Sequence, residues 1–191
     1  MATPEPPFTV TLAQGGCEVR DYPAMVVADV LVTGDRRAAA SKGFRLLAGY
    51  IFGGNTSKRS IAMTAPVIQA RKASETIAMT APVIQTGSNG AWVIRFIMPS
   101  GSVIATLPTP NNSAIKLHDL PEQRQAVIRF SGLAKQSDVD ENTRKLVQFM
   151  TAQRLEPAGS PALAQYDPPW TLWFMRRNEV MIPVAGARPP I

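Results

Sequence analysis

The chain repeats a loose pattern at an offset of 98 residues, and this internal repeat constrains the fold more than any other feature. In each half an Asp-x-Pro turn is followed by an apolar stretch, then by a glycine eleven residues after the proline, and then by a helical pattern. The sequence therefore predicts one plan carried out twice: strand, turn, strand, glycine, helix and returning strands. The matched pairs are Asp21/Asp119, Pro23/Pro121, Val30/Ile128, Val32/Phe130 and Gly34/Gly132.

Apolar residues at helical spacing predict one long helix in each half. The first should run from about Asp35 to Ile51, with Asp35 as its N-cap and the Gly53-Gly54 pair ending it. The second should run from about Ser137 to Arg154, opened by Ser137 and Asp140 as a variant of the capping box. The apolar faces are Ala40, Phe44, Leu47, Ala48 and Ile51 in the first helix, and Val139, Leu146, Phe149 and Met150 in the second.

The remaining apolar stretches predict strands, and the fold class follows from their arrangement. We predict an α+β fold: a distorted antiparallel β-barrel made of two pseudo-twofold-related four-stranded halves, each with one long helix. One domain should span 8–184, in halves of about 8–100 and 101–184, with tails at 1–7 and 185–191. The predicted strands are 8–12, 18–22, 25–33, 61–69, 77–85, 92–98, 115–118, 126–131, 171–175 and 180–184.

A second, shorter repeat is exact. Residues 61–69 and 77–85 both read IAMTAPVIQ, and this predicts a hairpin of two matched strands with Met63 and Met79 paired. Two soft thioethers could line a pocket for a large flat ligand. A duplicated core hairpin without any ligand explains the same pattern equally well.

Composition narrows the chemistry. The chain has one cysteine and one histidine, so it has no internal disulfide and no Cys/His metal cluster, and histidine acid/base catalysis is poorly supplied. The net charge of +6 comes from scattered basic pairs rather than one dense stripe, which argues against nucleic-acid binding. No apolar run is long enough to span a membrane, and no signal peptide is visible at the N-terminus. We expect a cytoplasmic monomer.

Four blocks of the sequence resemble the SOUL family of haem-binding proteins, and together they cover the chain from about Phe8 to Val184. They are CEVRDYPAMVVADV (17–30), GFRLLAGYIFGGN (43–55), the IAMTAPV copies, and YDPPWTLWFMRRNEVMIPV (166–184). The resemblance implies a pseudo-twofold barrel with two helices and a haem or related tetrapyrrole held noncovalently in a hydrophobic groove beside the first helix. It also implies kinship with bacterial effector-binding domains, which share the duplicated fold and bind other amphipathic molecules.

If haem binds, Phe44, Leu47 and Ile51 on the first helix are the candidate walls of the groove, although any core-facing helix needs the same spacing. Met63 and Met79 are candidates for weak ligation or for packing alone. The candidates for pairing with propionates are Arg45, Arg176 and Arg177, with Lys42 as a further one. Arg177 could instead form a structural ion pair with Glu179, since the two share a strand face.

His118 is the one histidine and the candidate iron ligand, although its position at the end of a predicted strand suggests a location away from the groove. Cys17 could supply a thiolate but is more typical of a small buried hydrophobe. The aromatic residues Trp170, Trp173 and Phe174 could stack on a macrocycle or seal the barrel end.

Three functions remain in competition. The first is a tetrapyrrole binder that buffers, stores or carries its ligand without turnover. The second is an effector-binding or scavenging module for other amphipathic small molecules. An enzyme is the third and least supported, since no nucleophile, base and orienting group can be assembled from the sequence.

Overall fold

The computed structural model describes residues 4–71, 90–167 and 170–186. In this part of the chain, nine strands form one antiparallel sheet, in the order β1-β2-β7-β9-β8-β4-β5-β3-β6. The strands are β1 (Thr9–Gln14), β2 (Cys17–Tyr22), β3 (Met25–Gly34), β4 (Val67–Arg71), β5 (Gly90–Ile97), β6 (Ile115–Leu120), β7 (Gln123–Ser131), β8 (Ala162–Gln165) and β9 (Arg177–Pro183). The helices are α1 (Arg36–Ile51) and α2 (Gln136–Ala152), with short 3-10 turns η1 (Ile104–Thr106) and η2 (Trp173–Met175).

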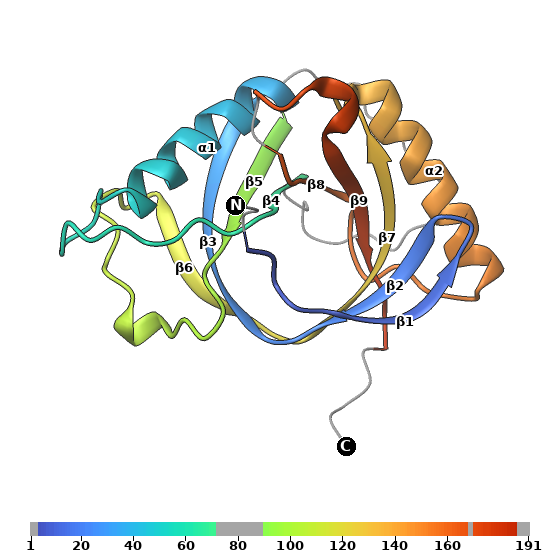
Figure 1. Cartoon of the computed structure of the whole chain (residues 1–191), viewed down its shortest axis with the longest axis horizontal. Coiled ribbons are helices and arrows are strands. Elements are labelled where there is room, and N and C mark those ends of the chain that lie inside the picture. The colour runs from blue at the N-terminus through green and yellow to red at the C-terminus, as the bar shows by residue number, and fades with distance from the viewer. Residues whose placement is uncertain (1–3, 72–89, 168–169, 187–191) are drawn as a thin grey trace.

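The sheet is strongly curved but open, so the predicted closed barrel is wrong. Among the described residues β1 pairs with β2 alone and β6 with β3 alone, which leaves one free edge at each end of the sheet. Closure would need these two edges to meet, and the described strands show no such pairing. Figure 1 shows both helices on the outer side of the curved sheet, one over each half, and the N-terminal segment on the inner side.

Without β1, which has no counterpart among the described strands, the strand order reads the same from both ends once each strand is replaced by the corresponding strand of the other half. The bounds of β2 and β6 differ by 98 residues, and β3 and β7 begin 98 residues apart, at the offset of the sequence repeat. In this scheme β5 corresponds to β9, and β4 and β8 meet in the middle of the sheet. The α+β class is confirmed, and the pseudo-twofold relation of the halves stays a prediction.

Helix α1 begins and ends where the sequence predicts. The Asp35 carboxylate accepts hydrogen bonds from the backbone N–H groups of Arg37 and Ala38, at 3.0 and 2.9 Å. Phe52 follows the last helical residue, and Gly53 then takes a φ of +106°, a left-handed conformation that glycine adopts without strain.

The buried face of α1 is rotated from the predicted one. It consists of Ala39, Gly43, Leu47, Tyr50 and Ile51, whereas the predicted Phe44 is on the exposed side. The reason is Gly43, where the helix lies so close to β5 that a Cβ would be 2.3 Å from Cγ1 of Ile94. A pattern of large apolar residues cannot reveal a contact made by a glycine.

Helix α2 packs as predicted, but its start differs. Leu146 and Met150 are buried, and Val139 and Phe149 pack partly buried beside them. Lys135 rather than Ser137 is the N-cap, and its backbone N–H donates to the Asp138 carboxylate at 3.0 Å. Because a lysine side chain accepts no hydrogen bond, this capping box has only one of its two bonds.

The first copy of the short repeat is strand only in its last part, and the predicted hairpin with the second copy lies outside the described residues. In the first copy only Val67–Gln69 is strand, and β4 is flanked on both sides, by β5 and by β8. Both edges of β4 are therefore taken by these two strands. Residues 77–85, with Met79, lie outside the described residues.

One predicted strand is absent and one strand was missed. Residues 171–175 form a bend and the 3-10 turn η2, because Met175 and Arg176 donate back to the Leu172 and Trp173 carbonyls. Strand β8 is only four residues long, ALAQ, too short to be recognised by its pattern. No helix within the described ranges is long and apolar enough to cross a membrane.

Candidate functional site

The two faces of the sheet have different roles. Helices α1 and α2 cover one face, where the buried side chains form two apolar clusters, one under each helix. The other face carries no helix and holds a pocket of about 250 Å³ near the middle of the sheet. Apolar side chains form most of its lining, which comprises Pro6, Tyr22, Met25, Asp29, Pro66, Ile68, Ala70, Val93, Arg95, Ile97, Leu120, Gln123, Gln125, Ser160, Ala162, Met181 and Pro183.

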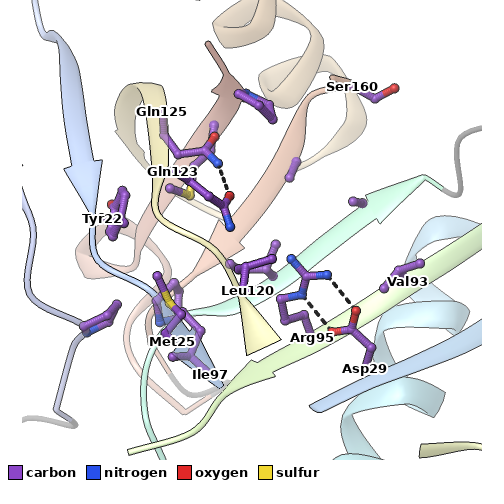
Figure 2. A pocket seen from close by; sticks show the side chains of 17 residues that line it. Tyr22, Met25, Asp29, Val93, Arg95, Ile97, Leu120, Gln123, Gln125 and Ser160 are labelled. Carbon is purple, nitrogen blue, oxygen red and sulfur yellow. Dashed lines mark hydrogen bonds and ion pairs between the residues drawn. The ribbon is translucent and has the colours of Figure 1, made fainter. Parts of the chain in front are cut away.

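One charged pair lines the pocket. Arg95 on β5 lies directly opposite Asp29 on β3, and its Nε and Nη2 donate to the two carboxylate oxygens at 2.7 and 2.6 Å (Figure 2). Both side chains are mostly buried. The pair is therefore a two-bond, charge-assisted contact that leaves the pocket without net charge at this point.

His118 lies next to this pair. Its Nε2 is 3.6 Å from Oδ2 of Asp29, and its side chain is partly exposed. His118 does not itself line the pocket. The only histidine is thus placed beside the rim of the pocket, nearer to it than its position near the end of a strand implied.

Two glutamines on β7 form the polar part of the opposite wall. Gln125 Nε2 donates to Gln123 Oε1 at 2.7 Å, as Figure 2 shows. The Nε2 of Gln123 is buried and has no hydrogen-bond partner in the structure. A buried donor without a partner costs free energy, so this amide is suited to a ligand that brings an acceptor.

The N-terminal segment crosses the helix-free face, and Pro6 lines the pocket. The segment is held at three points. Ala65 N–H donates to the Pro4 carbonyl at 2.9 Å, Glu5 pairs with Arg177 at 2.9 Å, and the Phe8 ring packs against Tyr22 with centroids 5.4 Å apart.

A buried polar cluster lies on the same face but does not line the pocket. Its centre is Glu179, which is fully buried and accepts hydrogen bonds from Arg20, Arg177 and Tyr166. Burial alone would raise the pKa of Glu179, but the bonds from Arg20 and Tyr166 hold it below its ordinary value. Burial, together with Glu179, raises the pKa of Tyr166 well above its ordinary range.

The sequence predictions for α1 do not meet in this pocket. Leu47 and Ile51 are buried in the cluster under α1, where they pack as core residues. Phe44 is 37% exposed, with its ring edge-on to Phe96 at 5.5 Å between centroids. Arg45 is exposed and donates to the Ser41 carbonyl within its own helix.

The remaining predicted residues are also dispersed. Met63 packs partly buried against the α1 core. Arg177 forms the predicted structural ion pair with Glu179, at 2.8 Å. Arg176 donates to the Thr171 carbonyl at 2.8 Å. Cys17 is buried in the α2 core, and burial raises the pKa of its thiol, as expected of an inert residue.

The aromatic residues before β9 do not seal the sheet, and that prediction is wrong. Trp170 is 84% exposed, and Trp173 and Phe174 are more than half exposed. Together with Leu172 and Met175 they form an exposed apolar segment, residues 170–175. The segment is ordered by its own turn, with the two rings of Trp173 and Phe174 edge to face.

The sequence did contain a signal for the pocket. Asp29 interrupts the apolar run MVVADV and Arg95 interrupts WVIRFI, so each charge is set into an otherwise buried strand. Such a charge requires a partner. Which of the distant charges pair is a matter of strand register, which no local pattern fixes.

Comparison with known proteins now decides the family. The family model described as SOUL heme-binding protein matches residues 3–183. The chain belongs to the SOUL heme-binding protein family. Among curated proteins the comparison gave no match.

Solved structures show the same fold at low sequence identity. The EcmrR C-terminal domain is similar over 88% of this SOUL-family chain and 96% of its own length, with 12% identity and a TM-score of 0.65. The chain spans 56% of EcmrR as present in a DNA complex. A protein called a hydrolase from Listeria innocua is similar over 92% of this chain and 94% of its own, with 12% identity and a TM-score of 0.59.

Proposed function

We propose that this SOUL-family chain binds haem or a related tetrapyrrole noncovalently and buffers, stores or carries it without chemical turnover. The observation that carries the proposal is the apolar pocket on the helix-free face, in a chain whose family match extends over almost its whole length. Haem, when bound, would supply a flat aromatic surface and a redox-active iron.

The chain's residues fit part of such a ligand. Ile68, Val93, Ile97, Leu120 and Met181 offer an apolar wall, and burying apolar surface against it contributes about 25 cal/mol per Å² before the cost of association. Drug-sized ligands occupy pockets of roughly 300–1,000 Å³. A pocket of about 250 Å³ therefore takes only part of a macrocycle, and the rest must contact the residues around the mouth.

The position of the N-terminal segment affects the size of the pocket. Pro6 forms part of the pocket wall, and its neighbours are held by one hydrogen bond at Pro4 and by the Arg177 side chain at Glu5. A shift of this short segment would widen the mouth without disturbing the sheet. We propose that a tetrapyrrole binds with the segment displaced.

A second candidate function is an effector-binding or scavenging module for smaller amphipathic molecules. The volume of the pocket favours it, since a molecule of one or two rings would fit without any shift. The fold alone cannot decide between the two candidates, because one fold can carry many ligands.

Titration of the purified chain with hemin tests the proposal. We expect a shifted Soret band that saturates at about one equivalent. The Ala70→Trp variant fills the pocket and should weaken binding at least about tenfold, whereas Phe44→Ala, at a partly exposed ring that does not line the pocket, should bind like the wild type. Thermal melting of both variants checks that they are folded.

The hemin titrations distinguish the absence of specific binding from binding at a different site. A spectrum of free or loosely adsorbed hemin, without saturation, would overturn tetrapyrrole binding. Saturable binding that is lost in Phe44→Ala and kept in Ala70→Trp would move the site to α1 and overturn its assignment to the pocket.

A further inference from the structure

We infer that the pocket selects amphipathic ligands with a carboxylate or another hydrogen-bond acceptor, and rejects hydrophobic cations. The inference rests on the proposed function of the pocket and names the chemistry that its polar side chains recognise. The inference is argued from the hydrogen-bond donors and acceptors that the lining side chains leave free.

The pocket lining has hydrogen-bond donors that are free to bind a ligand. Asp29 takes up Nε and Nη2 of Arg95, and a guanidinium has five N–H groups, so three of them are left for a ligand. The buried Nε2 of Gln123 adds a donor that has no partner. Both side chains line the pocket, from β5 and from the start of β7.

The anionic acceptor of the lining, in contrast, is already paired. Both oxygens of Asp29, the only carboxylate among the described residues of the lining, accept from Arg95, and His118 lies 3.6 Å from one of them. The Oε1 of Gln123 accepts from Gln125. A cationic ligand that pairs with Asp29 would have to break the pair of Asp29 and Arg95 and leave the mostly buried guanidinium without its partner, which is costly.

The other buried carboxylate of this face, that of Glu179, is also unavailable to a cationic ligand. Glu179 accepts from two arginines and from the Tyr166 hydroxyl, and it does not line the pocket. The positions of the second half that correspond to Asp29 and Arg95 are Val127 and Met181, which pair with each other in the same way. The charged pair of the pocket therefore has an apolar counterpart in the second half, whose polar contribution is the glutamine pair Gln123 and Gln125.

Two probes with the same ring system and opposite charge test the inference: 1-naphthylacetate and 1-naphthylmethylammonium, titrated by calorimetry at neutral pH. The wild type should bind the carboxylate at least about tenfold more tightly, as expected for a charge-assisted hydrogen bond. Arg95→Gln frees the Asp29 carboxylate and should reverse the preference. Asp29→Asn keeps the guanidinium and should retain or enlarge the preference for the carboxylate.

Gln123→Leu removes the second donor and should weaken the carboxylate about threefold or more, without improving the ammonium. Thermal melting of each variant establishes that it is folded, and Asp29→Asn tests the selectivity even if Arg95→Gln does not fold. Equal affinities of the wild type for both probes, a preference for the ammonium, or binding of neither would overturn the inference. Loss of saturable hemin binding in the wild type is a separate result, which would overturn the proposed tetrapyrrole function and leave the selectivity between the probes standing.

Discussion

Arg20 and Glu179 form a fully buried ion pair that joins β2 to β9 across the intervening strand β7, with N···O distances of 2.9 and 3.2 Å. The two residues are 159 positions apart in the chain. The pair therefore ties the N-terminal strands to the last strand of the sheet.

Replacement of Glu179 by leucine should destabilise the protein strongly. It leaves Arg20 and Arg177 without their shared carboxylate, and breaking a buried pair in this way costs about 3–5 kcal/mol. Arg20→Met should cost less, about 1–3 kcal/mol, because Arg177 and Tyr166 still donate to Glu179. Urea unfolding of the two variants measures the difference. A Glu179→Leu protein as stable as the wild type would contradict this account.

The same carboxylate predicts a loss of stability in acid. The folded state holds the pKa of Glu179 below its ordinary value of about 4.3, so the carboxylate contributes its full stability above that value. As the pH falls below about 4.3, the unfolded chain takes up the proton first, and stability declines until the folded pKa is passed. The unfolding free energy of Glu179→Gln, measured from about pH 6 to pH 3, should fall less steeply than that of the wild type. Parallel curves would show that Glu179 is not responsible.

Two glycines of α1 should respond in opposite ways to alanine. At Gly43 a Cβ would lie 2.3 Å from Cγ1 and 2.6 Å from Cβ of Ile94, so Gly43→Ala should cost about 1–3 kcal/mol through overpacking. At Gly49 nothing lies within 4 Å of the added Cβ. Gly49→Ala should therefore stabilise the helix by about 0.5–1 kcal/mol. Thermal or urea unfolding compares the two, and the same sign at both positions would refute the close contact of α1 with β5.

Replacement of His118 should leave the hemin spectrum unchanged. Its ring is placed beside Asp29 and does not line the pocket, so we expect His118→Ala to keep the Soret position of the wild type. The spectra of the two proteins, recorded at one equivalent of hemin, make the comparison. A shifted band in the variant would instead assign the histidine to the iron.

The elements that could be predicted from the sequence are those set by local chemistry. Asp35 caps α1 because a short carboxylate reaches the free N–H groups of a first turn wherever it stands. Leu146 and Met150 face the sheet because their spacing is helical. The 98-residue repeat likewise placed β2, β3, β6 and β7 within a few residues of their observed bounds.

The sequence did not reveal which strands, and therefore which side chains, pair with each other. The identical copies around Val67 and Val83 favour a hairpin locally, but in the structure β5 and β8 take both edges of β4. The pocket was missed for the same reason, because Asp29 meets Arg95 only through the register of β3 and β5. The groove residues expected on α1 followed from helix spacing alone, and in the structure that spacing serves the core.

The exposed apolar segment at residues 170–175 has a practical consequence for measuring ligand affinity. The chain has three tryptophans, and two of them, Trp170 and Trp173, are in this segment and outside the pocket. Quenching of tryptophan fluorescence by hemin would therefore report hemin adsorbed on these two exposed indoles as well as hemin bound in the pocket. A protein with both residues changed to phenylalanine would retain Trp92, buried beneath α1, as its single emitter.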